Sequence, residues 1–401
     1  MSTHKLNLGV AIASTIAMVM LISGCQTQSV KALPKAPAVV PKGTLTVLGQ
    51  YYGYVYIDGE WKVLPNDASA NGGPSDAFQS LDFSPKGMLT ATTVGSNDNA
   101  LVGNEIGLWT YDKRWRQATI NGDTNVSLYV WSPSNVLYAV PDDGQVAGIW
   151  YVSKNSWKSV KGSSALGYIN SIEISPKGTL TVTSQASNGA ASVWQDLNGK
   201  WTRLTTGNEA FAADGLQVKW SPTGVLTLGT SQHGVWQYVD GAWRQPGGVA
   251  SPIADVTQLS WSSQGTLVIS GDSSNSAGLW EMENGQWSRV DGANSPIAKD
   301  GIRQFGWSPS GVLTVSDSTN GHIYQYQNGK WTDIWSKSAS NGQDPVAPTF
   351  GWSPQGVLVC NGGNMDGLWQ YQNGKWTEIG GQNSPIKNQS SLLFGWSDGT
   401  N

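Results

Sequence analysis

Short stretches of alternating apolar and polar residues, separated by turn sequences, run through the chain from residue 43 onward. Residues 304–334 show the pattern: QFGW, then GVLTV, then HIYQYQ and finally KWTDI, with Ser-Pro, Ser/Asn/Gly-rich and Asn-Gly segments between them. Such alternation predicts β-strands rather than helices, and an Asn-Gly pair predicts a two-residue hairpin. The unit therefore predicts four short antiparallel strands.

One phrase, Trp-Ser-Pro-x-Gly followed by a hydrophobic residue and leucine, recurs where the first strand of each unit ends. Its copies, strict and looser together, begin at Phe83, Trp131, Ile174, Trp220, Trp261, Trp307 and Trp352, and Trp396 begins a last partial copy. Successive copies are 41 to 48 residues apart. A period of about 45 residues is typical of β-propeller blades and is too short for independent domains.

The two ends of the repeat region are incomplete in complementary ways. Pro41 to Val47 (PKGTLTV) is a unit without its first strand, and residues 392–401 (LLFGWSDGTN) are a first strand with nothing after it. We therefore predict an all-β fold, an eight-bladed β-propeller of four-stranded antiparallel blades, occupying residues 43–401 as one domain. The C-terminal strand, Leu392–Trp396, pairs with the three strands of residues 44–64, which leaves no open sheet edge.

This order of strands and turns resembles that of WD40-like propellers and, more loosely, tectonin-type lectin repeats. The resemblance covers about 350 residues and implies a fold only. The Gly-His signature of WD40 repeats is absent from its usual place, and no Trp-Asp pair ends a third strand. The hydrogen-bonding residues of that family are therefore not carried over to this chain.

The composition gives the tryptophans a central place in this fold. The chain has 21 tryptophans, 49 glycines and only 6 phenylalanines. Twenty of the tryptophans occupy three repeat positions, in first, third and fourth strands, and Trp335 lies outside the pattern. Because blades pack face to face, we interpret these rings mainly as core material. The fourth strands, which include Trp376, form the outer edge, where an exposed binding ring is most plausible.

The N-terminus resembles a bacterial lipoprotein signal. Lys5 precedes an apolar run, Leu6 to Ile22, which ends at Ser-Gly-Cys with Cys25. The resemblance implies that residues 1–24 are a signal peptide and that Cys25 is lipidated, for example with palmitate. Residues 25–42 would then be a Pro-rich tether to a membrane outside the cytoplasm.

In a Gram-negative cell this would be the outer membrane, as favoured by Gln26, and in a Gram-positive cell the outer face of the plasma membrane. An ordinary signal peptide and an uncleaved anchor are the alternatives.

Signals for catalysis are weak, and we predict no catalytic residue, metal or cofactor and hence no enzyme. His233 and His322 fall in similar loop positions two blades apart, and Ser384-Pro-Ile-Lys387 lacks the companion motifs of a Ser-x-x-Lys enzyme. Cys360 has no partner once Cys25 is lipidated, so it is predicted to be a buried free thiol. The formal net charge is −4, so the chain lacks the excess of basic residues that is typical of nucleic-acid-binding proteins.

Binding residues are expected in the irregular loops between second and third strands, which share one face with the Ser-Pro-Ile connections between blades. The acidic and amide side chains there could hydrogen-bond sugar hydroxyls or peptide groups, but they are also ordinary turn formers. With the outer-edge tryptophan, the candidate ligand-binding residues are Asp142, Asp143, Asp272, Asp317, Asn364, Asp366 and Trp376.

Three functional hypotheses follow. The first is a lipid-anchored interaction scaffold that contacts a protein or another component of the cell envelope through its loop-rich face. The second is a lectin-like propeller in which edge tryptophans stack on carbohydrate. The third is a propeller enzyme, which would need a cluster of acidic or histidine side chains at the central funnel.

Overall fold

The computed structural model describes fifteen segments of the chain. They are residues 40–49, 52–64, 77–94, 107–142, 146–185, 191–212, 214–271, 278–292, 295–297, 301–317, 321–335, 348–361, 367–381, 384–387 and 392–397. The chain divides into two units, Met1–Leu33 and Pro34–Asn401, and every described residue belongs to the second.

The described residues form eight four-stranded sheets, which are numbered here as blades in chain order. Blade 1 comprises β4 (Ala77–Phe83), β5 (Leu89–Val94), β6 (Gly107–Tyr111) and β7 (Trp115–Gln117). Blade 2 comprises β8 (Val126–Trp131), β9 (Leu137–Pro141), β10 (Trp150–Ser153) and β11 (Ser156–Ser159). Blade 3 comprises β12 (Tyr168–Ile174), β13 (Leu180–Gln185), β14 (Ala191–Leu197) and β15 (Lys200–Arg203). Blade 4 comprises β16 (Leu216–Trp220), β17 (Leu226–Thr230), β18 (Val235–Val239) and β19 (Ala242–Arg244).

The second half of the ring repeats this order. Blade 5 comprises β20 (Gln258–Trp261), β21 (Leu267–Gly271), β22 (Gly278–Glu283) and β23 (Gln286–Arg289). Blade 6 comprises β24 (Ile302–Trp307), β25 (Leu313–Asp317), β26 (Ile323–Gln327) and β27 (Lys330–Asp333). Blade 7 comprises β28 (Thr349–Trp352), β29 (Leu358–Asn361), β30 (Leu368–Gln372) and β31 (Lys375–Glu378). Blade 8 comprises β32 (Leu393–Trp396), β1 (Leu45–Leu48), β2 (Gly53–Ile57) and β3 (Glu60–Leu64).

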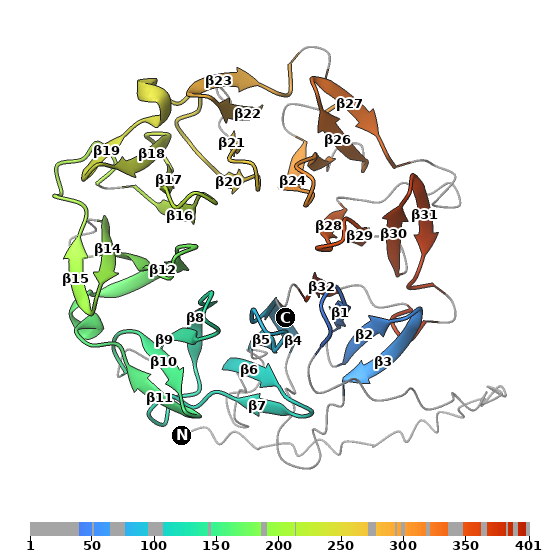
Figure 1. The fold of residues 1–401 in the computed structure, drawn as a ribbon, viewed down its shortest axis with the longest axis horizontal. Coiled ribbons are helices and arrows are strands. Elements are labelled where there is room, and N and C mark those ends of the chain that lie inside the picture. The colour runs from blue at the N-terminus through green and yellow to red at the C-terminus, as the bar shows by residue number, and fades with distance from the viewer. Residues whose placement is uncertain are drawn as a thin grey trace, which may run out of the picture. The chain divides into compact units, whose positions relative to one another are not determined.

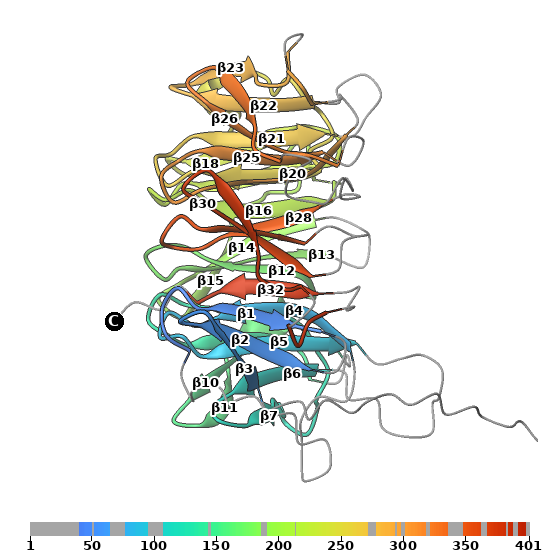
Figure 2. The same cartoon turned by 90° about the vertical axis from the view of Figure 1, so that its right-hand side faces the viewer.

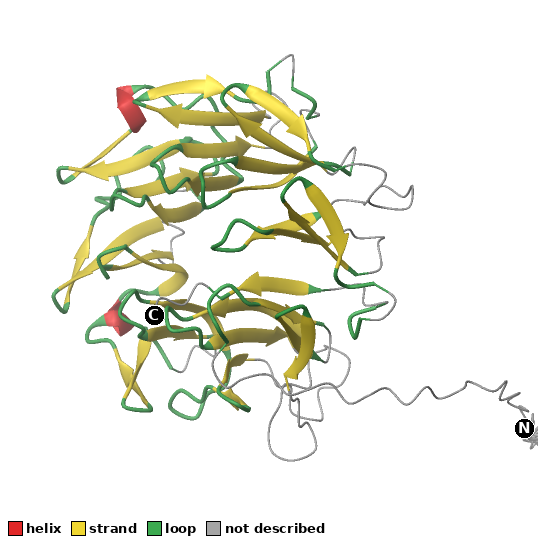
Figure 3. Ribbon diagram, turned by 45° about the vertical axis from the view of Figure 1, so that its right-hand side comes forward, coloured by secondary structure: helices red, strands yellow, loops and turns green. Residues whose placement is uncertain are grey.

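Figure 1 shows the blades arranged as a ring, with each first strand on the inside and each fourth strand on the outside. Among the described residues, helix is confined to two 3₁₀ turns, η1 (Ser163–Ala165) and η2 (Pro246–Gly248), and the rest is strand and connection (Figure 3). Viewed edge-on in Figure 2, hairpin turns of successive blades gather on one face. The predicted fold class is confirmed.

Ring closure follows the prediction as well. β32 pairs antiparallel with β1, with Leu45 opposite Trp396 and Leu48 opposite Leu393. The backbone N–H of Thr44 donates to the Ser397 hydroxyl at 3.0 Å, across 353 residues of sequence. One blade is therefore made from both ends of the repeat region, and the ring has no free sheet edge at that position.

The serine of each Ser-Pro-x-Gly turn has a local structural role. In blade 6, for example, the buried Ser308 accepts the backbone N–H of Val312 at 2.9 Å, and Gly311 takes a positive φ of 81°. Equivalent bonds are accepted by Ser84, Ser132, Ser175, Ser221, Ser262 and Ser353. This side-chain bond closes the turn between first and second strands, which explains why serine recurs there.

The first strands of blades 6, 7 and 8 each contain a Phe-Gly-Trp sequence at which neighbouring blades pack together. A side chain at Gly306 would stand 3.6 Å from the Phe350 ring of the next blade, and one at Gly351 would stand 3.4 Å from Phe394. The ring of one blade thus lies over the glycine of the blade before it. Both distances are ordinary van der Waals contacts, so the aromatic ring packs directly against the strand of the preceding blade at the glycine position.

The tryptophans are packed as expected. All 21 lie within the described residues and none is exposed; five are buried and the others are half-buried. Trp369, expected in the core, is 9% exposed. Cys360 is fully buried as a free thiol, and burial raises its pKa well above the ordinary value.

Candidate functional site

The outer hairpins of several blades carry a tyrosine directly opposite a tryptophan. Tyr56 faces Trp61 across β2 and β3 with ring centroids 4.9 Å apart, and Tyr326 faces Trp331 across β26 and β27 at the same separation. The same cross-strand contact joins Tyr111 to Trp115, Tyr238 to Trp243 and Tyr371 to Trp376. Directly opposed aromatic residues stabilise a hairpin, which accounts for this recurrence.

The tryptophan of the pair also ties its blade to the preceding one. The indole N–H of Trp61 donates to the Ile379 carbonyl at 2.9 Å, and that of Trp331 donates to the Val290 carbonyl at 3.2 Å. The same bond runs from Trp243 to Leu204 and from Trp376 to Ile334, and Trp201, which faces Asp196 instead of a tyrosine, donates to the Lys161 carbonyl. At these positions the indole N–H already donates to a carbonyl of the preceding blade. A ligand would therefore contact the edge of the ring and the groups beside it.

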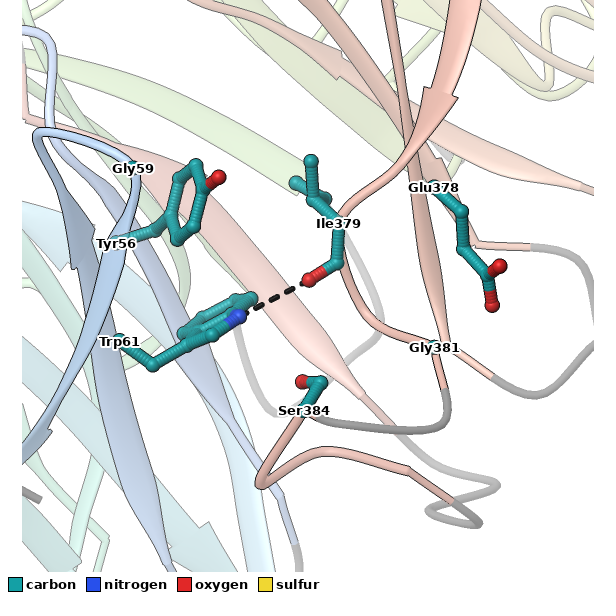
Figure 4. A pocket seen from close by; sticks show the side chains of 7 residues that line it. All are labelled: Tyr56, Gly59, Trp61, Glu378, Ile379, Gly381 and Ser384. Carbon is teal, nitrogen blue, oxygen red and sulfur yellow. Dashed lines mark hydrogen bonds between the residues drawn. The ribbon is translucent and has the colours of Figure 1, made fainter.

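At the junction of blades 7 and 8, this arrangement borders an open pocket of about 380 Å³, which we call rim pocket 1. It is lined by Tyr56, Gly59, Trp61, Glu378, Ile379, Gly381 and Ser384. Figure 4 shows the Tyr56 ring beside the Trp61 indole, with Glu378 and Ser384 coming from the preceding blade. The pocket therefore combines two aromatic rings with hydroxyl and carboxylate groups.

A second pocket of about 440 Å³, rim pocket 2, lies at the junction of blades 5 and 6. It is lined by Arg289, Val290, Gly292, Ser295, Tyr326, Gly329, Lys330 and Trp331. The tyrosine, tryptophan, glycines and serine occupy the same repeat positions as in rim pocket 1. The fold thus builds one kind of site twice, with some lining residues exchanged.

The connection that enters each pocket is held by its Ser-Pro-Ile sequence. Ser384 accepts the Ile386 backbone N–H at 3.2 Å, and Ser295 accepts that of Ile297 at 3.1 Å. Both isoleucines are buried, with 0% and 5% exposed. The serine fixes a tight local turn, and the isoleucine anchors the connection in the interblade core.

These pockets were not predicted from the sequence, although a signal exists. Both connections read Gly-x-Asn-Ser-Pro-Ile, at residues 292–297 and 381–386, and both following hairpins read Tyr-x-Asn/Asp-Gly-x-Trp. We expected the Ser-Pro-Ile connections to lie on the face of the irregular loops. The pockets show them beside the hairpins of the outer strands, since Ser384 and Gly59 line rim pocket 1 and Ser295 and Gly329 line rim pocket 2.

At two other junctions an aromatic side chain from the connection packs on the outer tryptophan instead. Trp335 contacts Trp376 with centroids 4.9 Å apart, and Phe211 contacts Trp243 at 5.5 Å. Trp335 is 2% exposed and Phe211 is fully buried. Trp335, which lies outside the repeat pattern, thus fills the space between blades 6 and 7 by packing on Trp376.

The charged groups of rim pocket 2 are organised by a buried carboxylate. Arg289 donates through Nε to Oδ1 of Asp291 at 2.9 Å, and the Asp291 side chain is fully buried. The hydrogen bond to Asp291 raises the pKa of Arg289. Burial raises the pKa of Tyr326, with a smaller contribution from nearby Glu281. Arg289 and Tyr326 therefore stay protonated through neutral pH, and the tyrosine can donate a hydrogen bond.

The predicted ligand residues have different positions in this structure. Asp142 is exposed after β9, while Asp317 ends β25 with a fully buried side chain. Trp376 is half-buried against Trp335 and Tyr371. Cys25, Asp143, Asp272, Asn364 and Asp366 lie outside the described residues. The described positions do not come together in either rim pocket, and the binding roles stay predictions.

The two loop histidines each pair with a different aspartate. Nδ1 of His233 lies 2.8 Å from Asp214, and Nδ1 of His322 lies 2.7 Å from Asp333. Across the fifteen described segments, no group of three His, Cys, Asp or Glu side chains is placed to hold a metal ion. Within the same segments, no helix has the length and apolar character to cross a membrane.

The described fold and its rim pockets define the chain as an eight-bladed β-propeller with repeated aromatic sites between blades. No protein-family model matches the sequence, and no curated protein matches it. Among solved structures, virginiamycin B lyase from Staphylococcus aureus is similar, with 14% identity and a TM-score of 0.43, over 63% of this chain and 83% of that one.

Two further structures are similar at the same level. The extracellular domain of BT4673 from B. thetaiotaomicron shares 11% identity over 89% of this chain and 56% of that one, with a TM-score of 0.42. The β-propeller domain of Cps50 (Swd1) from Myceliophteria thermophila shares 12% identity over 74% of this chain and 95% of that one, with a TM-score of 0.44. These likenesses are ones of fold.

Proposed function

We propose that the protein is a carbohydrate-binding propeller that acts by binding rather than catalysis. We further propose that Cys25 anchors it, through lipid, to a membrane outside the cytoplasm. The observation that carries the binding proposal is that the same aromatic and polar pocket is built at two repeat-equivalent junctions. A purely structural contact needs no open space, and the equivalent contacts at Trp335 and Phe211 are filled.

The chemistry of the pockets suits a sugar. Tyrosine and tryptophan rings present apolar edges and faces to the C–H groups of a pyranose, and the serine, tyrosine and charged groups can bond its hydroxyls. Their volumes, about 380 and 440 Å³, fall within the ~300–1,000 Å³ range of small-molecule sites. Their open form at the rim suits one residue of a longer chain.

The interaction-scaffold hypothesis concerns the loop-rich face. Most of the loops that it relies on, such as 95–106, 272–277 and 362–366, lie outside the described residues. It remains a prediction that affinity purification of the intact protein from its own envelope would test. Recovery of the same envelope protein with both pockets disabled would support the scaffold over the lectin.

A glycan array with the detergent-purified full-length protein tests the carbohydrate proposal. We expect selective binding, a loss of about tenfold in affinity at the altered site in Tyr56→Ala or Tyr326→Ala, and a loss of that size at both sites in the double variant. Tyr371→Ala is the matched control, because its partner Trp376 is covered by Trp335. A silent array, or a double variant that binds like the wild type, would overturn the proposal.

A further inference from the structure

The two rim pockets share the tyrosine, tryptophan, glycine and serine residues that line them, but three positions at or beside them differ in charge. Asp58 aligns with Asn328, Glu60 with Lys330, and Glu378 with Arg289, where the first residue of each pair belongs to the rim pocket 1 side. At each pair the residue at or beside rim pocket 1 is acidic, and its counterpart at or beside rim pocket 2 is neutral or basic; of the six, Glu378, Arg289 and Lys330 line a pocket. The repeat has thus kept the aromatic residues and exchanged the charges around them.

Rim pocket 1 has one acidic lining residue, Glu378, whose side chain points away from the Tyr56 and Trp61 rings in Figure 4. Glu378 is exposed, and its Oε1 lies so close to Gly381 that an added Cβ there would be 2.0 Å away. The seven described residues that line the pocket include no cation. Asp58 and Glu60 lie on the exposed hairpin beside Trp61 and add to the negative potential. A second negative group would be repelled from this pocket.

Rim pocket 2 presents cations. Arg289 lines it with its charge balanced by the buried Asp291, and Lys330 lines it from the exposed hairpin without such a buried counter-charge. A carboxylate is present nearby on β22, at Glu281, which accepts a hydrogen bond from Ser288 at 3.0 Å and is not among the lining residues. The side chains that a ligand would meet are therefore basic.

We propose that rim pocket 2 accepts a sugar residue bearing a carboxylate, whereas rim pocket 1 accepts a neutral or amine-bearing one. This inference rests on the proposed carbohydrate-binding function and adds a ligand class for each pocket. The charged groups are at the surface, so each pocket prefers its own class by about fivefold, and the preference weakens with salt.

The test isolates one pocket at a time. Tyr56→Ala weakens rim pocket 1 about tenfold and keeps rim pocket 2 intact, and Tyr326→Ala does the reverse. The probes are oligosaccharides of equal length built from glucose, glucuronic acid or glucosamine, titrated calorimetrically into the detergent-purified protein at low and high salt. We expect the Tyr56→Ala protein to favour the glucuronic acid probe and the Tyr326→Ala protein to favour the glucosamine probe.

Reversing the charge of Lys330 tests whether this side chain sets the preference of rim pocket 2. Adding Lys330→Glu to the Tyr56→Ala protein should abolish its preference for the acidic probe. The matched control, Lys375→Glu, changes the same hairpin position in blade 7, next to the covered Trp376, and should leave the preference unchanged.

Equal binding of all three probes by both proteins would overturn the charge assignment while leaving the carbohydrate proposal in place. Failure of every probe to bind the wild-type protein would overturn both.

Discussion

At two junctions between blades, a tryptophan side chain donates a hydrogen bond to a threonine hydroxyl of the blade before it. The indole N–H of Trp131 donates to the Thr90 hydroxyl at 3.0 Å, and that of Trp352 donates to the Thr314 hydroxyl at 3.1 Å. In each case a first strand reaches the second strand of the blade before it. A buried donor without an acceptor costs free energy, so these bonds matter for the choice of residue at both positions.

The bond is absent at other junctions, including two where both residue types are kept. There the indole nitrogens of Trp220 and Trp261, and the hydroxyls of Thr181 and Thr227 at the equivalent positions, are buried without a partner. Val268 stands at the threonine position before Trp307, whose indole nitrogen is buried with no hydrogen-bond partner. At the junction of blades 8 and 1 the reverse holds: Phe83 takes the tryptophan position, and the hydroxyl of Thr46 is buried without a partner. The presence of tryptophan and threonine at these positions therefore does not by itself decide whether the bond forms.

Three substitutions, measured by urea denaturation, test how much these Trp–Thr hydrogen bonds contribute to stability. Thr314→Val removes the acceptor of Trp352 and should lower the free energy of unfolding by about 1–2 kcal/mol. Val268→Thr introduces before Trp307 the residue that stands unbonded before Trp220 and Trp261, and should lower it by about 1 kcal/mol. Thr46→Val removes a hydroxyl that has no partner and should be neutral or stabilising. A loss of similar size in all three would show that shape, rather than the hydrogen bond, sets stability there.

At the scale of a single element, β29 holds the one thiol predicted to be free. Cys360 pairs with Phe350 on one side and with Trp369 on the other, so both neighbouring strands of blade 7 cover it. The thiolate is the form of cysteine that reacts with thiol reagents. Burial of Cys360 both blocks access of the reagent and raises the pKa of its thiol, which lowers the fraction present as thiolate. Labelling of Cys360 therefore requires blade 7 to open.

We expect Cys360 in the native protein to react with a maleimide at least a hundredfold more slowly than in the urea-unfolded protein, because opening costs several kcal/mol. The Cys25→Ala variant removes the other cysteine and gives a clean readout by mass spectrometry. Labelling of the folded protein at the unfolded rate would contradict the burial described for β29.

At the scale of the whole molecule, closure of the ring depends on a strand of four residues. Deleting residues 392–401 removes β32 and uncovers β1, with the loss of about 2 kcal/mol for each of three large apolar side chains. We expect the melting temperature to fall by about 10 °C. Deleting only residues 398–401 keeps β32 and should change it little. An unchanged melting temperature in the longer deletion would rule out a stabilising role for closure.

The membrane anchor is tested on the intact cell envelope. Replacing Cys25 with alanine should release the protein into the soluble fraction after a high-salt wash, because lipid attachment is expected at that thiol. The wild type should stay with the membrane under the same wash. Retention of the Cys25→Ala protein would contradict lipidation as the means of anchoring.

The fold was predictable because its determinants repeat within one blade. Period, turn residues and the incomplete ends together specify the number of blades and their closure. The rim pockets were not predictable in the same way, because each is built from two blades. In rim pocket 1, Trp61 meets Ile379 across 318 residues of sequence. Whether a junction is open or filled depends on single residues of the connection, such as Trp335, whose direction no periodicity reveals.

The position of the two pockets in the ring sets how a long ligand would be held. Their hairpins belong to blades 6 and 8, so they stand a quarter of an eight-bladed ring apart. A polymer that spans this distance would bind its second pocket at a high effective concentration, and its overall avidity would far exceed either single affinity. Short fragments would lose that advantage, so chain length itself would become part of the specificity of the protein.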